Sequence, residues 1–463
     1  MCNLKLLLVV LPAALSLQVH VFAQNSPANA AQATAPPPVT APELPPQVPA
    51  ANSITMHEAL QTALKDNPQI TAARYSVLSA RENFNSQKSP INPTVNYGAV
   101  NNTVAPLDFA TGFGQSYNYS AYATIETNGA ITYRTRQARE QYHQAQFDAA
   151  TTGLSLQLNV ISAYVGVQVA NRALEVELKV YENMHQLSDL TAKRFEAGAG
   201  TDADARRARI AFVQERQNVI TDAANVNSAR AALNAQLGHP VGTPIDVSEP
   251  LTYKQAPLHD LADLTRQAEQ NRPELQSANA NLRALKAVPG LARSAYYPNL
   301  VVARDFAGDS SVDVGLSVPL DLGSIRGAVK KARADVKTQE AQVELARQNI
   351  DLDVKNSYVN LDAAQKQVAT YDGGILQDSE ALLNQTRQAY TLGAGTILDV
   401  MTAENTYRAV MTSYYSAIGT YVVAFYTLQH SIGDLPDPLP PIALVTAAAP
   451  RGAAGASKRK NTP

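Results

Sequence analysis

Hydrophobic and polar residues alternate in two short parts of the chain, and a period of two is typical of β-strands. The clearest run is residues 311–320, in which valine and leucine fill one face while serine, aspartate, glycine and proline fill the other. Residues 117–125 alternate in the same way, but more weakly. With the segments before them, these runs predict two β-hairpins, at about residues 93–127 and 298–321, and therefore four strands, two in each half of the chain.

Most of the remaining chain has the hydrophobic period of an amphipathic helix. Helices are predicted for residues 55–65 and 258–270. An X-Pro step follows each of them, and a second helix then continues to about Lys88 in the first half and through Ala287 in the second. Each half of the chain therefore begins with two short helices and continues into a β-hairpin.

Two much longer helices follow the hairpins. They run without a proline or an evident cap from Gly129 to Glu196 and from Gly323 to Leu392. Each has about 65 residues, or roughly 95–100 Å at the helical rise. A returning helix of about 35 residues follows each of them. Helices of this length predict coiled-coil hairpins that pack in a bundle.

The same turn sequence, Gly-x-Gly-Thr-x-x-Asp, separates the two helices of each long hairpin. The copies are 195 positions apart and consist of Gly198, Gly200, Thr201 and Asp204 in the first half and of Gly393, Gly395, Thr396 and Asp399 in the second. The glycines stop a helix, and the threonine and aspartate suit the start of the next one. The motif predicts a hairpin tip, and its repetition predicts a duplicated structure.

The two ends of the chain have a different character. Lys5, the apolar residues 6–15 and the Val21-Phe22-Ala23 cleavage site predict a secretory signal peptide. The apolar stretch is too short for a membrane anchor, and no later segment supplies about 18 uninterrupted apolar residues. Cys2 is the only cysteine, so a chain cleaved after this signal would have no disulfide, no thiolate metal site and no cysteine nucleophile.

These observations predict a division of the chain into six parts, two of which are Ala/Pro-rich segments that we expect to be disordered. The parts are a signal peptide (1–23), a disordered leader (24–53), a first repeat (54–240, tip at 198–204), an inter-repeat linker or equatorial region (241–256), a second repeat (257–435, tip at 393–399) and a disordered tail (436–463).

Composition and charge argue against several functions. The 38 basic residues nearly balance the 40 acidic ones among 463, so the chain has no electrostatic reason to bind nucleic acid. Six histidines after the signal are scattered without a His-Glu-x-x-His motif or a triad-like setting, and no glycine-rich loop follows a strand as a phosphate cradle would. The sequence therefore predicts no catalytic residue, cofactor or metal site, and no enzyme.

Four strands with one apolar face cannot bury both of their edges. An open sheet edge is prone to aggregation in water, and in a bilayer its amides would be unsatisfied. A barrel that closes only when several copies share their strands solves this problem, and an apolar-out, polar-in barrel is a water-filled pore. The alternative that remains from the residues alone is a small soluble β-cap on a helical stalk.

The two tips and the end of the first repeat carry a family likeness. The tips have the spacing of Phe195, Gly198 and Asp204 and of Tyr390, Gly393 and Asp399, and the repeat ends in Leu-Asn-x-x-Leu-Gly at 233–238. From about residue 54 to 435 the chain resembles the TolC-type outer membrane factors. The resemblance implies a mainly α fold with a membrane β-barrel part, in which long helical hairpins form an α-barrel and four strands per protomer complete a twelve-strand barrel in a trimer.

The resemblance also implies a function and partners. The homotrimer would be a channel-tunnel in outer-membrane lipid that extends into the periplasm and acts as the passive exit duct of a tripartite efflux or type I secretion system. It would bind a periplasmic adaptor (membrane fusion) protein and an inner-membrane pump of the RND, ABC or MFS type. The competing interpretation is a structural periplasmic coiled-coil stalk, or an adaptor, without a pore.

Members of that family close the periplasmic tip with acidic rings and with polar links between hairpins, so the resemblance implies a gate here. Asp204 and Asp399 fall on acidic tip positions, Tyr390 falls on a linking tyrosine, and Asp202 adds a carboxylate. The chain departs from the family pattern where a second acid, a linking arginine and its threonine partner are expected, and has Thr402, Gly395 and Ala203 there. We expect a gate with fewer polar bonds. Helix capping alone is the other explanation of both Thr-x-x-Asp sequences.

Overall fold

The computed structural model describes residues 53–100, 116–305, 312–317 and 320–434. These residues all belong to one of the chain's two units, Pro45–Pro463. The predicted turns of both β-hairpins lie outside the described residues, as do the signal peptide, the leader up to residue 52 and the tail from residue 435.

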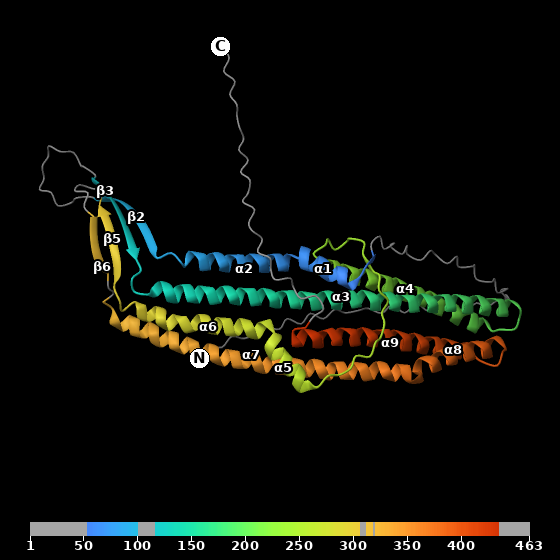
Figure 1. Ribbon diagram of the computed structural model, residues 1–463. Helices are drawn as coiled ribbons and strands as arrows, with labels where there is room; N and C mark the ends of the chain where they lie inside the picture. Colours follow the sequence, from blue (N-terminus) through green and yellow to red (C-terminus); the bar gives the residue numbers. More distant parts are fainter. Residues whose placement is uncertain (1–52, 101–115, 306–311, 318–319, 435–463) are drawn as a thin grey trace, which may run out of the picture. The chain divides into compact units, whose positions relative to one another are not determined.

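The described elements repeat in order, as the sequence predicts (Figure 1). The first half contains β1 (Ser53–Ile54), α1 (Met56–Asp66), α2 (Pro68–Ser86), β2 (Ile91–Val100), β3 (Ser116–Ile125), α3 (Ala130–Glu196) and α4 (Asp202–Leu237). The second half contains β4 (Asp246–Val247), α5 (Leu261–Asn271), α6 (Pro273–Ser294), β5 (Asn299–Asp305), β6 (Val312–Ser317), α7 (Leu322–Thr370), α8 (Leu376–Thr391) and α9 (Ile397–Ile432).

The second long helix differs from its prediction as one unbroken rod. A π-helical turn over Tyr371–Ile375 separates α7 from α8, and within it Gly374 has a φ of 126°. Only glycine adopts such a conformation without strain, and Gly374 meets this requirement. By contrast α3 is continuous over 67 residues. The duplicated hairpins are therefore not equivalent.

Two shorter helices also have different bounds from those predicted. α5 begins at Leu261 rather than at residue 258, and α6 continues past Ala287 to Ser294 with Pro289 inside it. Proline removes one backbone donor from a helix and normally disfavours its continuation. Here Ala284, Ala287 and Ser294 are buried on both sides of the proline, so the helix holds together through packing.

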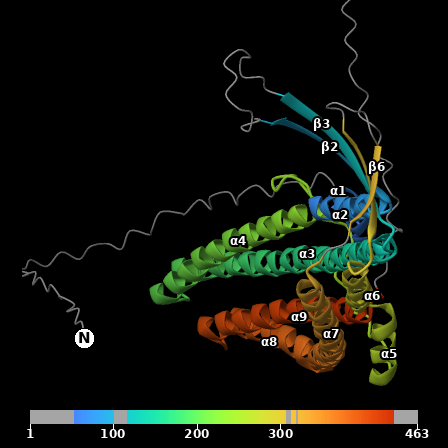
Figure 2. The same cartoon turned by 90° about the vertical axis from the view of Figure 1, so that its left-hand side faces the viewer.

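The helices pack side by side in the same order at two positions along α3, one near the sheet and one in the long hairpins. At the level near the sheet, α3 contacts α2 and α6, and α6 contacts α7. At the level of the long hairpins, α3 contacts α4 and α9, and α9 contacts α7 and α8 (Figures 1 and 2). At both levels a first-repeat helix, α2 or α4, is at one side and α7 or α8 is at the other.

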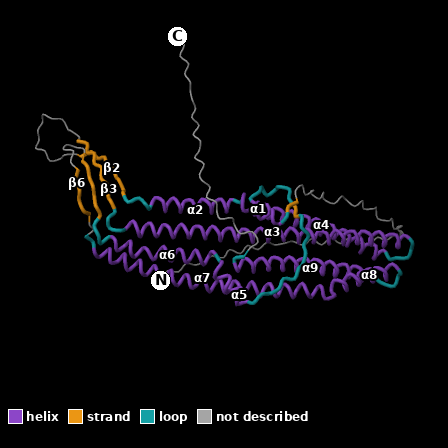
Figure 3. Tube along the Cα trace, in the orientation of Figure 1, coloured by secondary structure: helices purple, strands orange, loops and turns teal. Residues whose placement is uncertain are grey.

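The four longer strands form one antiparallel sheet in the order β2-β3-β5-β6. The two hairpins join through β3 and β5, where Tyr122 pairs with Ala303, and β2 and β6 are the edges. Figure 3 shows these strands gathered beyond the ends of the helices. The order across the sheet repeats the order across the helices, with the first repeat at one edge and the second at the other.

The described part of the chain has two strands more than the four predicted. β1 and β4 pair in parallel, with Ser53 opposite Asp246 and Ile54 opposite Val247. The Tyr164 hydroxyl of α3 donates to the Ile54 carbonyl at 3.0 Å, and the Ser248 amide donates to the same carbonyl at 3.0 Å. The inter-repeat linker is thus fastened to the residues that precede α1, a pairing of only two residues that no alternation pattern indicates.

The main hydrophobic core lies around this pairing. It includes the fully buried Val160, Ile161 and Tyr164 of α3, and it takes residues from α1, α4, α5, α6, α7 and α9 as well. One helix in the described chain, α3, contains an 18-residue window with a mean hydropathy of 1.2, of which 50% is buried inside the protein. A core helix has this property, and α3 lies between helices of both repeats.

Candidate functional site: the hairpin tips and the seam between them

Both predicted tips fold as the repeated motif indicates. Gly198 has a φ of 70° and Gly393 a φ of 77°, and each lies in a left-handed turn directly after the C-cap residue of its helix. The next amide in each tip reaches back five residues, from Ala199 to the Arg194 carbonyl and from Ala394 to the Ala389 carbonyl, both at 2.8 Å. These bonds satisfy carbonyl groups that the helix end leaves open.

The second glycine of each motif is needed for a different reason. A Cβ atom on Gly200 would lie 3.3 Å from the Arg194 Cβ and the Phe195 backbone nitrogen. A Cβ atom on Gly395 would lie 3.2 Å from the Ala389 Cβ and the Tyr390 nitrogen. The chain passes this closely over the helix that it has just left, so the position where the family likeness suggests an arginine is restricted by packing in this protein.

The threonine and the aspartate cap the returning helices. The Asp204 amide donates to the Thr201 hydroxyl oxygen at 3.1 Å, and that hydroxyl donates to the Asp204 carboxylate at 2.7 Å. In the second tip the Asp399 carboxylate accepts from both the Thr396 amide, at 3.0 Å, and the Thr396 hydroxyl, at 2.7 Å. The hydrogen bonds from Thr396 lower the pKa of Asp399. The capping explanation therefore describes contacts that both aspartates make.

The acidic residues of the first tip are also paired with cations of their own helix. Asp202 accepts from Arg206 at 2.7 Å, and Asp204 accepts from Arg207 at 3.2 Å. Asp399 accepts from the amide and the hydroxyl of Thr396. The two tips thus present different electrostatics, because only the first has arginines beside its carboxylates.

One residue that the sequence reasoning did not single out joins the two tips. The Arg194 guanidinium donates to the Tyr390 carbonyl at 2.7 Å and lies 5.0 Å from the centre of the Tyr390 ring. Tyr390 is only 7% exposed, and burial raises its pKa. Asp204 is close enough to act on the Tyr390 hydroxyl electrostatically, but its carboxylate bonds to Thr201 and Arg207. Arg194 thus connects the two tips within one chain, whereas Gly395 occupies the position of the family's linking arginine.

The three residues that depart from the family pattern are Gly395, Thr402 and Ala203. Gly395 closes the turn, and the Thr402 hydroxyl donates to the Leu398 carbonyl of its own helix at 2.8 Å. Ala203 is part of the first turn of α4. Within the described chain none of these three contributes a side-chain bond to the other hairpin.

Above the tips, the two hairpins meet through a seam of polar residues, in which the three glutamates and the tyrosine are buried. We use "seam" for Glu177, Lys179 and Asn183 of α3, Glu215 of α4, Arg387 of α8 and Glu404, Tyr407 and Arg408 of α9. Glu404 is 1% exposed and bonds to Arg387 and to Asn183, the latter at 3.3 Å. Lys179 donates to the Tyr407 hydroxyl at 3.0 Å. Arg408 contacts Glu177 at 3.4 Å and also bonds to Glu215.

The seam was missed because charged residues in a long helix are normally assigned to its solvated face. A signal was available, since Glu404 follows Ala403 and lies within the apolar spacing of Val400, Ala403 and Tyr407. An acidic residue on an apolar helix stripe indicates a buried charge that needs a partner. The sequence alone does not say which residue, far along the chain, that partner is.

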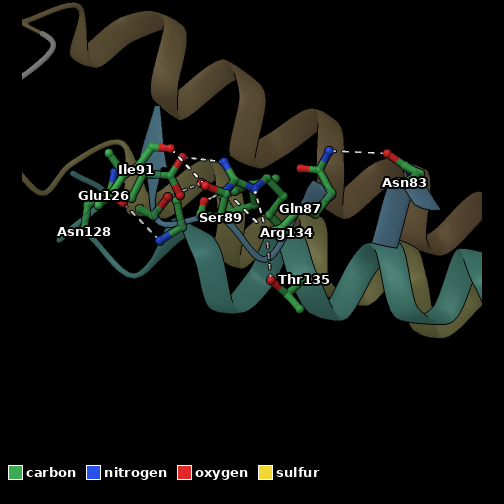
Figure 4. Close-up of polar contacts among 11 residues, drawn as sticks. Asn83, Gln87, Ser89, Ile91, Glu126, Asn128, Arg134 and Thr135 are labelled. Carbon is green, nitrogen blue, oxygen red and sulfur yellow. Dashed lines mark hydrogen bonds and ion pairs between the residues drawn. The ribbon is translucent and has the colours of Figure 1, made fainter. Parts of the chain in front are cut away.

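At the other end of α3 a polar cluster ties the helices to the sheet (Figure 4). Arg134 forms an ion pair with Glu126 at the end of β3 and donates to the Ser89 carbonyl at 2.9 Å. Thr135 donates to the Gln87 carbonyl at 3.1 Å. One turn of α3 thereby holds the end of α2, the start of β2 and the end of β3 together.

Comparison with known proteins identifies the family. A family model described as "Outer membrane efflux protein" matches residues 59–239 and 264–434. Each matched segment is one repeat, and together they leave out the linker and the two ends. The chain therefore belongs to the outer membrane efflux protein family, a family of channels and not of enzymes. It is a protein of the cell outer membrane that extends into the periplasm.

Individual relatives agree with this assignment. The chain is 28% identical over 278 residues to the "Probable efflux pump outer membrane protein TtgC" of Pseudomonas putida, a match that covers 56% of this chain and 55% of that protein. It is 22% identical over 417 residues to the "Outer membrane protein TolC" of Escherichia coli, covering 82% of each. The outer-membrane channel OprN has a similar fold, with a TM-score of 0.69 at 19% identity over 83% of this chain and 91% of OprN. The match thus spans about half the length of the first relative.

Proposed function

We propose that three copies of this chain form an outer-membrane channel whose helical part is a tunnel through the periplasm. The channel serves as the passive exit duct of a tripartite efflux or type I secretion system. The seam and the tips hold its inner end, and the sheet is the part that enters the lipid.

The observation that carries this proposal is the common order of elements across the sheet and both helical levels. β2, α2 and α4 of the first repeat are at one side, and β6, α7 and α8 of the second repeat are at the other. A second copy can therefore bring its first-repeat side against the second-repeat side of the first copy at every level at once. Such a head-to-tail contact generates a ring when the rotation closes.

The exposed side chains of the second-repeat side support this contact. Leu345, Leu352 and Val359 of α7 recur every seven residues and are 56%, 56% and 53% exposed. A heptad of exposed apolar residues is the pattern by which helices pack side by side in a coiled coil. We assign this stripe to the interface with α2 or α4 of the next copy.

The edge strand β6 supports a place in lipid. Val312, Val314 and Leu316 are 59–70% exposed on one face, while Asp313, Gly315 and Ser317 form the other face. Four strands per copy supply twelve in a trimer, an even number within the range of bacterial outer-membrane barrels. Closure removes the open edges at β2 and β6, which a bilayer does not tolerate.

The proposal assigns a gate to the tips. Asp204 and Asp399 would each occur three times around the channel axis, with Asp202 nearby and Tyr390 held by Arg194. An inner-membrane pump of the RND, ABC or MFS type would drive transport, and a periplasmic adaptor protein would connect the pump to the duct. This agrees with the names of relatives that belong to efflux pumps.

The competing function is a periplasmic stalk or adaptor without a pore. It is disfavoured by β6, because a soluble cap would not leave three large apolar side chains of one strand face this exposed.

Two measurements on the purified full-length protein decide between these functions. Native mass spectrometry in detergent should give a trimer, and insertion into planar bilayers should give discrete conductance steps. Leu352→Glu should weaken the trimer, while Lys337→Glu, at an exposed polar position of the same helix that does not belong to this heptad, should leave it intact. A stable monomer without conductance would overturn the proposal.

A further inference from the structure

Exposed basic residues occur at matching positions near the sheet-side ends of the two long helices that follow the strands. α3 carries Arg136 and Arg139 there, and α7 carries Lys330 and Arg333. Each of the two residues of α7 lies 194 positions after its counterpart in α3. We use "collar" for these four cations, all of which are exposed. Because both repeats place the same charge at the same point, the four side chains form one feature of the duplicated fold.

Carboxylates of the same chain do not neutralise the collar. The nearest acids along the two helices are bonded to other cations: Asp335 accepts from Lys331, and Glu140 accepts from Arg283, each at 2.7 Å. Among the described residues, no ion pair includes a collar cation. Exposed cations that lack a partner favour an anion supplied by the surroundings.

A neighbouring copy does not supply these anions either. In the proposed ring, α2 of the next copy lies beside α7 at the level near the sheet. That helix contains one acidic residue, Glu82, and two basic ones, Arg74 and Arg81. The side chain of Glu82 accepts from Asn85 of its own helix at 3.3 Å. The anion that matches the collar therefore comes from outside the protein.

The collar lies on the flank of the helices that the inter-repeat linker covers further along. In α3, Arg139 directly follows the buried Ala138, just as Gln168 directly follows the buried Val167. A residue that follows a buried one is turned by the same angle around the helix, so Arg139 and Gln168 share a flank. The Gln168 side chain donates to the Glu249 carbonyl of the linker at 2.8 Å.

The second repeat has the same arrangement. In α7, Arg333 directly follows the buried Ala332, and Asp362 directly follows the buried Leu361. Asp362 lines a cavity together with Tyr253 of the linker. The linker thus adds a second layer on this flank of both helices. Because a duct keeps its axis open, this layer and the collar lie on the outside of the proposed ring.

An exposed apolar surface leads directly to the collar. Leu320 and Leu322 are 89% and 50% exposed between β6 and the first turn of α7, and Lys330 lies eight residues further, or roughly 12 Å. Tyr297, between α6 and β5, is 63% exposed, and tyrosine is enriched at membrane–water interfaces. Side chains on a helix lean towards its N-terminus, which in α3 and α7 is the end at the sheet (Figure 1). Long basic side chains can therefore reach the edge of the lipid.

From this order of apolar, aromatic and basic residues we propose that the collar binds the phosphate groups of anionic phospholipids on the periplasmic side of the outer membrane. In a trimer the four cations occur three times and form a ring just outside the hydrocarbon. Anionic headgroups attract Lys and Arg close to the surface, and the attraction falls off within a Debye length. The ring thereby sets the depth of the sheet in the bilayer. This inference rests on the proposed channel function, because it takes the sheet to lie in lipid.

The experiment measures which lipids stay on the full-length protein. The protein is placed in nanodiscs that contain equal amounts of phosphatidylglycerol and phosphatidylcholine, and the released complexes are weighed by native mass spectrometry. Phosphatidylglycerol should be retained in excess, and a wash at high salt before release should lower this excess. Each Lys or Arg near an anionic surface contributes roughly a factor of five in affinity. Arg136→Gln combined with Lys330→Gln should therefore lower the excess by at least about fivefold.

Matched variants identify the surface responsible. Arg172→Gln combined with Lys366→Gln removes the same charge from the same two helices, 36 residues or roughly 54 Å further from the sheet, and should keep the wild-type excess. Arg136→Lys combined with Lys330→Arg keeps the charge and should also keep the excess. An unchanged excess in the Arg136→Gln, Lys330→Gln variant, or an equal loss in the Arg172→Gln, Lys366→Gln variant, would overturn the proposal.

Two further measurements separate the lipid from other anions. An excess of inorganic phosphate, at matched ionic strength, should not displace phosphatidylglycerol, because only the lipid is held beside the collar by its acyl chains. Displacement would mean that the collar is a site for free phosphate. A trimer that dissociates when Arg136 and Lys330 are both changed to Gln would mean that these cations join neighbouring copies. Either result would overturn the lipid assignment.

Bilayer conductance of the same proteins distinguishes this inference from the proposed function. If channels form and phosphatidylglycerol is not retained in excess, the channel function stands and the lipid collar is wrong. If the collar retains phosphatidylglycerol and no conductance is observed, the lipid contact stands and the channel function is wrong.

Discussion

The two long hairpins share their turns but differ in the helices that lead to them. Both tips have a left-handed glycine, a closely packed second glycine and a Thr-x-x-Asp cap. In the first hairpin Leu178 and Lys179 continue the helix, and Lys179 bonds to Tyr407. Their counterparts 195 positions later are Gly373 and Gly374, where the second helix breaks. The two repeats thus share their local turn chemistry, while the helix that leads to the tip is continuous in the first repeat and broken in the second.

The largest expected effect comes from removing the cation that joins the hairpins. Arg408→Met leaves Glu177 and Glu215 together without a guanidinium, so the free energy of unfolding should fall by about 3 kcal/mol. This is the lower end of the range for removing one partner of a buried ion pair, because Arg408 is partly exposed. Urea unfolding followed by circular dichroism checks this. Arg206→Met, which removes an exposed pair with Asp202, should produce no resolvable change. Equal losses of stability in the two variants would mean that Arg408 stabilises the protein no more than an exposed ion pair does.

The break in the second helix can be tested with two neighbouring glycines. Gly374→Ala should lower the stability by about 1–2 kcal/mol, because φ at this position is 126° and an alanine is strained there. Gly373→Ala should be neutral or stabilising by up to about 1 kcal/mol, because no atom lies within 4 Å of the added Cβ and its φ is not positive. Thermal unfolding of both variants measures the difference. The same sign for both would contradict a break that depends on Gly374.

The two caps should differ modestly. Thr201→Ala and Thr396→Ala each remove a side chain that accepts from an amide of the following helix, at a cost of about 1 kcal/mol. The loss should be smaller at Thr396, because the backbone amide of residue 396 still donates to Asp399 after the substitution. Hydrogen exchange of the Asp204 and Asp399 amides reports each tip separately. Thr402→Ala, which removes only a bond within α9, should leave both amides unchanged.

The smallest effect concerns the carboxylates as gate residues. Asp204→Ala combined with Asp399→Ala should raise the single-channel conductance or weaken block by multivalent cations. The Asp399 change should contribute more, because Arg207 partly neutralises Asp204. Conductance and block that remain as in the wild type would leave these residues with the capping role alone.

Local patterns predicted most of the fold. The strands, the tips and the lengths of α3, α4 and α9 follow from residues within one or two turns of each other, as in the Thr55–Glu58 capping box that starts α1. The π-helical turn was missed because a glycine pair inside a long polar helix is also compatible with a continuous helix. The parallel pairing of Ser53 with Asp246 was missed because two residues carry no period.

Less of the candidate site than of the fold could be predicted from the sequence. The turn residues and their caps were predicted by number, since each depends on its own neighbours in the chain. Arg194 and the seam were not, because their partners are about 200 positions away. Whether a charged residue on a long helix faces water or another hairpin depends on which helix packs beside it.

The sequence by itself determined that this protein is a duplicated set of helical hairpins with two capped tips and an alternating sheet. These features arise from hydrogen bonds and steric limits within a few residues. Only the tertiary structure decided that Arg194 joins the tips, that Arg408 gathers two buried glutamates, and that the second hairpin bends at Gly374. The energy of a buried charge depends on partners that packing brings from distant parts of the chain, and a single sequence does not state which helices will meet.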